Sequence, residues 1–127
     1  LQEETERIRA QLRSMYAKFM GNKQPEKLTG KTVIVIDDGV ATGNTLIGSI
    51  NMLKKEKPAK IVIAVPVASL KAVNKLSSVV NQVVCPQTPY GFTGVSSFYD
   101  NFDQVTDEEA IFCLNQLKTE QTNSGSR

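Results

Sequence analysis

The 127-residue sequence, with 40% hydrophobic and 22% charged residues, has the composition of one soluble globular domain. Its formal net charge of +2 gives no strong field of one sign, which argues against nucleic acid as a partner. No apolar run approaches the roughly 18 residues of a membrane span, so we expect no membrane association. Cys85 and Cys113 lie in apolar sequence and suit buried thiols of a reducing compartment, which predicts a cytoplasmic protein.

The N-terminal stretch, residues 3–20, predicts an amphipathic helix. Its apolar residues recur at steps of three and four positions, and they are Ile8, Leu12, Met15, Tyr16 and Phe19. Gly21 suits the end of such a helix. The sequence starts with Leu1 instead of Met, already inside this helical pattern. We therefore expect the chain to be a fragment of a longer protein.

Residues 32–65 predict a strand, a helix and a second strand. The run 32–36 is continuous, β-branched and typical of a strand buried on both faces of a parallel sheet. An amphipathic helix follows a glycine-containing loop and should end before Pro58. Residues 60–65 repeat the β-branched pattern. Two parallel strands joined by a helix imply a right-handed crossover.

The second half predicts a third strand and two more helices. Ser69 can cap one helix, the strand follows at 82–85, and Thr106 can cap the last helix. That last helix should bury Ile111, Phe112, Leu114 and Leu117. We expect an α/β fold with a mainly parallel sheet and helices on both faces. Residues 1–119 would form a single partial domain and 120–127 a disordered tail.

The loop after the first strand carries the chemistry. Asp37 and Asp38 leave the strand at the edge where parallel sheets bind ligands, and two adjacent carboxylates can hold a ribose diol or share a divalent cation. Residues 41–45 present backbone N–H groups and hydroxyls at a helix start, which favours a phosphate. The pattern predicts a ribose 5-phosphate site. The alternative is that the aspartates only cap the turn, while a Walker A loop and a dinucleotide fingerprint are excluded by spacing.

The run 33–45, VIVIDDGVATGNT, resembles the phosphoribosyl pyrophosphate (PRPP) motif of type I phosphoribosyltransferases. A looser resemblance over 64–68 and 95–109 extends to a bacterial branch of that family whose acceptor is undefined. The resemblance implies Mg²⁺-dependent transfer of the phosphoribosyl group from PRPP to a nitrogen nucleophile, such as a nucleobase, with release of pyrophosphate. It also implies that Asp37 and Asp38 act in catalysis and hold Mg²⁺. The implied PRPP-binding residues are Asp37, Asp38, Gly39, Val40, Ala41, Thr42, Gly43, Asn44 and Thr45.

The sequence departs from the family at two places. Ala41 stands where members that salvage 6-oxopurines have aspartate, whereas uracil-type members share the Ala-Thr-Gly run, so a purine acceptor is disfavoured. The pyrophosphate-binding loop has no counterpart before Val33, so the fold would lack its N-terminal strands. We expect the chain alone to be impaired, and to form a homodimer or associate with a missing N-terminal half. Tyr99 and Asp100 are the first candidates for acceptor contacts.

Two other functions stay open. A non-catalytic regulatory module could keep the same fold to sense PRPP or a nucleotide. A phosphoacceptor domain would explain the acidic pair but not residues 42–45 at the start of the helix. The sequence contains no histidine, which excludes Ser-His-Asp and Cys-His catalysis and any histidine-based metal site.

Overall fold

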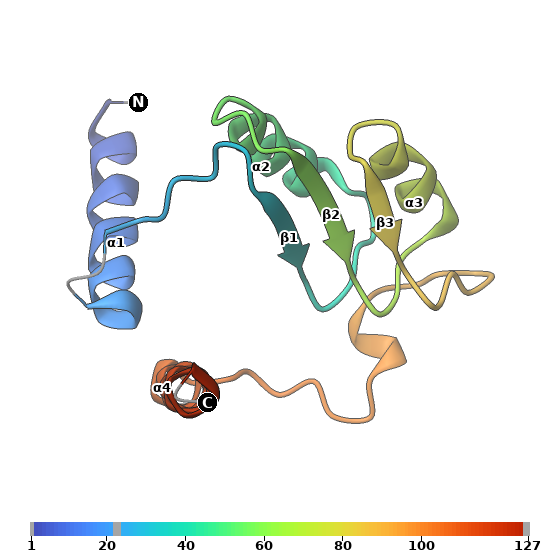
Figure 1. Cartoon of the computed structure of the whole chain (residues 1–127). Helices are drawn as coiled ribbons and strands as arrows, with labels where there is room; N and C mark the ends of the chain where they lie inside the picture. The colour runs from blue at the N-terminus through green and yellow to red at the C-terminus, as the bar shows by residue number, and fades with distance from the viewer. Residues whose placement is uncertain (1, 22–23, 126–127) are drawn as a thin grey trace. The chain divides into compact units, whose positions relative to one another are not determined.

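The computed structural model describes residues 2–21 and 24–125 (Figure 1), and it divides the chain into two compact units. One unit, Glu26–Phe102, contains the sheet. The other combines the N-terminal segment up to Pro25 with the C-terminal segment from Asp103. The prediction of a single domain over 1–119 remains a prediction, because compactness alone does not say which units fold independently.

The sheet has three parallel strands in the order β1-β2-β3, which are Thr32–Ile36, Lys60–Ala64 and Gln82–Val84. Helix α2 (Asn44–Lys54) connects the first pair and helix α3 (Leu70–Ser77) the second. The predicted α/β fold with a parallel sheet and flanking helices is confirmed. Because all strands run the same way, their carboxyl ends lie at one edge, and the loops that follow β1 and β2 both start there (Figure 1).

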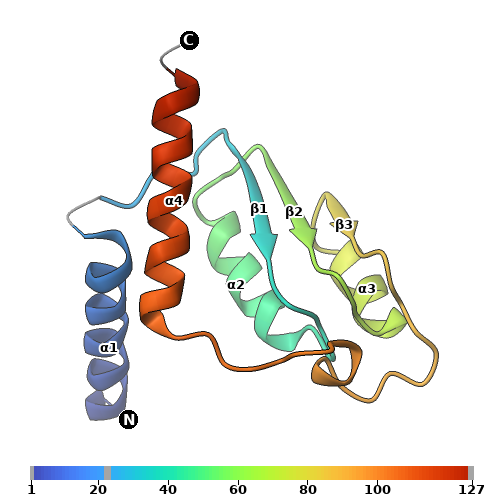
Figure 2. The same cartoon turned by 90° about the horizontal axis from the view of Figure 1, so that it is seen from below.

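Both helices cover the same face of the sheet (Figure 2). Ile50 of α2 and Leu76 of α3 pack with Ile63 of β2 in one hydrophobic core, and all three are fully buried. On the opposite face Ile34 and Ile36 are 59% and 77% exposed. The predictions that β1 is buried on both faces and that helices cover both are therefore wrong for this unit. Two successive crossovers of one hand, advancing in one direction, place both helices on one side.

The second unit contains two long helices, α1 (Gln2–Met20) and α4 (Asp107–Gly125). Lys18 Nζ of α1 lies 2.9 Å from Asp107 Oδ2 at the start of α4. Thr106 Oγ1 accepts a 3.2 Å hydrogen bond from the Glu109 N–H, as the capping prediction requires. None of the helices with described residues is long and apolar enough to cross a membrane. The cytoplasmic location remains a prediction.

Three predictions for α4 are corrected by the structure. The helix continues through residue 125, so 120–125 are helical instead of a disordered tail, because elongating an existing helix costs little per residue. Residues 126–127 lie outside the described part. Phe112 and Leu117 are 62% and 56% exposed instead of buried. Cys113 is also exposed, while Cys85 is half-buried. One neighbouring helix covers too little of the surface of α4 to bury all of its apolar side chains.

Because the core lies on one face of the sheet, replacing two isoleucines on opposite faces should change the free energy of unfolding by very different amounts. Ile63 is 0% exposed, so Ile63→Ala leaves a cavity and should lower the free energy of unfolding by about 2 to 5 kcal/mol. Ile36→Ala, on the open face, is the matched control and should change it by less than about 1 kcal/mol. Urea unfolding followed by circular dichroism measures both. Equal losses for the two variants would contradict burial of only one face.

Candidate functional site

The loop from Asp37 to Gly43 joins the carboxyl end of β1 to α2 and forms a pocket of about 180 Å³. The pocket is lined by Asp37, Gly39, Val40, Ala41, Thr42, Gly43, Thr45 and Leu46. The predicted binding residues therefore gather around one pocket, with Asp38 and Asn44 beside it instead of in its lining. Asp37 and the first residues of a helix thus line the same pocket.

The start of α2 offers backbone donors to this pocket. Gly43 is the residue before the helix and adopts a left-handed conformation with φ 82°, which favours glycine because it has no Cβ. The Asn44 N–H donates a long hydrogen bond of 3.5 Å to the Thr42 hydroxyl, and the first turn contains no acidic residue. The first N–H groups of a helix have no partner within it and carry a partial positive charge. This end of the pocket therefore suits an anion.

A second loop, which follows β2, holds the first one in place. The Val40 N–H donates to the Val67 carbonyl at 3.1 Å, and the Ser69 N–H donates to the Val40 carbonyl at 3.1 Å. The Ser69 hydroxyl donates to the Ala41 carbonyl at 2.7 Å and accepts from the Ala72 N–H at 3.1 Å. Sequence reasoning identified Ser69 only as a helix cap. The bond to Ala41 depends on two loops meeting in space, so no sequence signal indicates it.

The aromatic segment after β3 supports the same loop. The Tyr99 hydroxyl donates to the carbonyl oxygen of Asp38. The ring of Tyr99 lies 5.1 Å from that of Phe102, and Val95, just before the short 3₁₀ helix η1 (Ser96–Phe98), packs against Gly39. Tyr99 thus lies beside the predicted PRPP loop, with its hydroxyl engaged by the backbone. Asp100 is exposed. The assignment of these two residues to an acceptor site remains a prediction.

The two aspartates influence each other electrostatically. The Asp38 N–H donates to Asp37 Oδ1 at 2.9 Å. Partial burial of its carboxyl group, and next the negative charge of Asp37, raise the pKa of Asp38. The residue as a whole is exposed, so solvent screens both effects. A cation or a group that donates hydrogen bonds would stabilise the ionised pair.

The carboxylate pair fits Mg²⁺ that binds together with a ligand. Mg²⁺ takes oxygen ligands, and in nucleotide sites it commonly uses one or two carboxylates and completes its shell with phosphate oxygens and water. Among the described residues, no group of three or more histidine, cysteine, aspartate or glutamate side chains could enclose a metal by itself. Asp37 and Asp38 would therefore hold the ion only in part, with the ligand supplying the rest.

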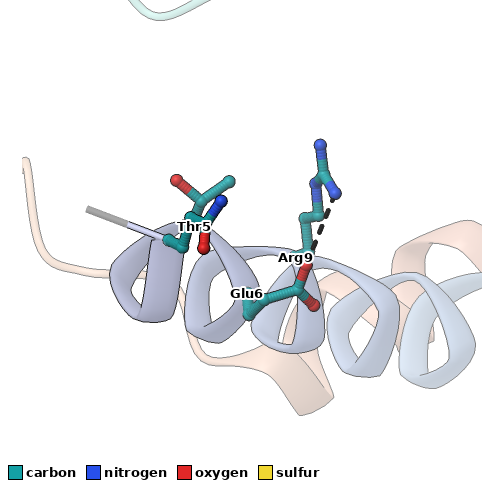
Figure 3. A pocket seen from close by; sticks show the side chains of 4 residues that line it. Thr5, Glu6 and Arg9 are labelled. Carbon is teal, nitrogen blue, oxygen red and sulfur yellow. Dashed lines mark ion pairs between the residues drawn. The ribbon is translucent and has the colours of Figure 1, made fainter.

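A larger hollow of about 550 Å³ lies elsewhere, along α1 (Figure 3). It is lined by Gln2, Thr5, Glu6 and Arg9, and Arg9 Nη1 lies 3.6 Å from Glu6 Oε1. All four lining residues belong to one helix, so side chains from different elements do not converge on it. A binding site normally needs such convergence. The smaller pocket at the start of α2 is the candidate site because residues of the predicted binding loop, among them Asp37, Thr42 and Gly43, line it.

Comparison with known proteins agrees with the fold and the loop. Residues 3–101 match the phosphoribosyl transferase domain. The chain belongs to this family. It is 29% identical over 109 residues to a Mycobacterium tuberculosis protein named "Putative phosphoribosyl transferase", covering 86% of this chain and 25% of that protein. It is 39% identical over 54 residues to the uracil phosphoribosyltransferase of Mycoplasma genitalium, covering 42% of this chain and 26% of that enzyme.

A solved structure supports the same assignment. A crystal structure of a protein from Thermus thermophilus superimposes with a TM-score of 0.74 and 34% sequence identity. The match covers 87% of this chain and 52% of that protein. The resemblance to the phosphoribosyltransferase family predicted from the sequence is thus confirmed. The chain spans about a quarter of the length of the curated relatives, so their whole-protein activities do not transfer to it directly.

The close contact of Gly39 with Val95 and Val67 allows the packing of the loop to be tested by measuring stability. A Cβ at this position would lie 2.6 Å from Val95 Cγ1 and 3.0 Å from the Val67 carbonyl oxygen. We expect Gly39→Ala to lower the free energy of unfolding by about 1 to 3 kcal/mol, because the added methyl group overpacks the site. Adding Val95→Ala should recover part of the loss, since it removes only one of the two clashes. Thermal unfolding measures both, and an unchanged Gly39→Ala variant would contradict the tight packing.

The raised pKa of Asp38 predicts a pH-dependent effect of its removal. The folded chain holds this proton more tightly than the unfolded chain, so the stability that protonation contributes is complete below the unfolded pKa of about 3.9. It is lost as the pH rises through the higher folded pKa. Asp38→Asn should therefore be at least as stable as the unchanged chain at pH 7, with the difference disappearing near pH 3.

Thermal unfolding at both pH values checks this prediction. Asp100→Asn removes the same charge from an exposed position of the same unit and serves as the control. An Asp38→Asn variant clearly less stable than the control at pH 7 would show that ionised Asp38 stabilises the loop, which contradicts the prediction.

Proposed function

We propose that this chain carries the PRPP-binding part of a Mg²⁺-dependent phosphoribosyltransferase that transfers the phosphoribosyl group to a nitrogen nucleophile, such as a nucleobase. The observation that carries the proposal is the pocket lined by Asp37 and by the start of α2. Membership of the family supports it independently. A carboxylate and the N–H groups of a helix start around one pocket suit the hydroxyl groups and the phosphate of a ribose 5-phosphate.

Each part of the pocket has a role in this proposal. The N–H groups around Thr42, Gly43 and Thr45 bind the 5-phosphate, with the Thr42 and Thr45 hydroxyls as further donors. Asp37 and Asp38 accept hydrogen bonds from the ribose hydroxyls and hold Mg²⁺ on that side of the sugar. Gly39 and Val40 shape the backbone between the two ends. Since Ser69 and Tyr99 hold this loop from two sides, the ligand meets donors that are already in position.

The chemistry then follows from charge. Breaking the bond between the ribose and pyrophosphate leaves positive charge on the sugar ring and negative charge on the leaving group. When bound, Mg²⁺ would neutralise the charge that grows on pyrophosphate. The carboxylates of Asp37 and Asp38 lie on the sugar side, where negative charge stabilises the cationic ring. Fixing the 5-phosphate at α2 keeps the ring oriented towards the incoming nitrogen.

The acceptor enters from a side that the described residues define only in part. Ala41 lines the pocket and cannot donate or relay a proton, which favours an acceptor that needs no acid–base group at this point. Tyr99 and Asp100 remain our proposed acceptor contacts because the aromatic segment reaches the loop through Asp38. A homodimer or a partner segment would complete the site.

Isothermal titration of the 127-residue chain with PRPP and Mg²⁺, repeated with ribose 5-phosphate, tests the proposal. Both ligands should bind, and Asp38→Asn should weaken both at least roughly tenfold because the ribose loses a charged acceptor. Asp103→Asn, which removes the same charge from the other unit, should bind like the unchanged chain. Failure of both ligands to bind would contradict the proposal.

Comparison of the two ligands also locates the pyrophosphate donors. Equal affinities for PRPP and ribose 5-phosphate would mean that no residue of this chain contributes to binding the pyrophosphate group. Tighter binding of PRPP would mean that residues of this chain do bind the pyrophosphate group. Tight binding of PRPP without release of pyrophosphate, on adding a nucleobase to the full protein, would favour the regulatory module over the transferase.

A further inference from the structure

A lysine of α3 lies beside the anion-binding end of α2. The Lys75 ammonium donates a hydrogen bond to the side-chain oxygen of Asn44, the first residue of α2. The residue before α2 also lies against α3, since a Cβ on Gly43 would lie 3.5 Å from Leu76 Cγ. Two neighbouring residues of α3 therefore contact two neighbouring residues at the start of α2.

Positive charge at the start of α2 has no negative partner in the contacts described above. A helix start carries partial positive charge, which disfavours a cation nearby and favours an anion. The first turn of α2 nevertheless contains no acidic residue. Among the described residues, the polar partner of the Lys75 ammonium is a neutral amide, not a carboxylate. An ammonium group and a helix start are thus brought together without an acidic partner in either contact, and a bound phosphate would supply the negative charge.

We propose that Lys75 is a further positioning residue of the phosphate subsite, a proposal that rests on the proposed function. Its hydrogen bond to Asn44 fixes the first turn of α2, so that the N–H groups of that turn stay directed to the pocket. Its positive charge raises the affinity for a doubly charged phosphate without Lys75 lining the pocket. Asn44, for which the sequence indicated only a place in the loop, links Lys75 to the start of α2.

Titration with ribose 5-phosphate at low and at moderate ionic strength tests this role. Lys75→Met removes the charge and the hydrogen bond and should weaken binding roughly three- to tenfold. Lys75→Gln keeps a donor but not the charge, and should show a similar loss with a flatter dependence of affinity on salt. Lys75→Arg restores both and should bind within about twofold of the unchanged chain.

The matched control is Lys54→Gln, which removes an equal charge from the last turn of α2. Helix α2 spans Asn44–Lys54, which places that charge about 15 Å from Asn44 along its axis. The control should leave affinity and its salt dependence nearly unchanged. Thermal unfolding of every variant checks that the fold is kept, since a purely structural role of Lys75 would lower stability but not alter the salt dependence.

The outcomes separate this inference from the proposed function. If the unchanged chain binds ribose 5-phosphate and Lys75→Met binds equally well, the role of Lys75 is overturned while the proposed site stands. If Lys75→Arg fails to restore binding, positive charge at this place is not what matters, and the inference is also overturned. If the unchanged chain binds no ribose 5-phosphate, the proposed function fails first.

Discussion

The parallel pairing of β1 with β2 is the constraint on which the site depends. Thr32 to Ile36 pair in register with Lys60 to Ala64, so both strands end at the same level of the sheet. The loops that leave them must then meet, which permits the bonds between Val40 and Val67 and between Ser69 and Ala41. Slipping this register would separate the two loops. A phosphate subsite made of backbone donors would then lose its shape, since those donors are fixed only by the loop.

The loop combines two opposite electrostatic demands within a few residues. At its start, adjacent carboxylates repel each other, and burial and the charge of Asp37 raise the pKa of Asp38. At its end, the start of α2 and the Lys75 ammonium carry positive charge. In an isolated chain both arrangements cost free energy. The proposed ligand, with its hydroxyls, its cation and its phosphate, would stabilise both, which is why we propose a role in binding for this arrangement.

Apolar surface is distributed unevenly over the two units. The Glu26–Phe102 unit has a hydrophobic core between the sheet and α2 and α3, yet leaves Ile34 and Ile36 exposed on the other face. In the helical unit, Leu12 is 59% exposed and Phe112 is 62% exposed. Association with another surface would remove this apolar area from water. The expected homodimer or partner segment is consistent with that surface, and it remains a prediction.

The sequence by itself determined the main strands and helices, and it predicted the chemistry of the loop. β-branched runs predicted β1 and β2, and the acidic pair followed by Ala-Thr-Gly-Asn-Thr indicated a ribose-phosphate site, because these signals are local. Only the tertiary structure decided what holds the loop and the helix start after it: Ser69 and Tyr99 bond to the loop and Lys75 bonds to Asn44, contacts between distant segments that no local pattern encodes. It also decided that both helices cover one face. A β-branched run shows that a strand favours burial, but whether a second layer covers it depends on which elements pack there.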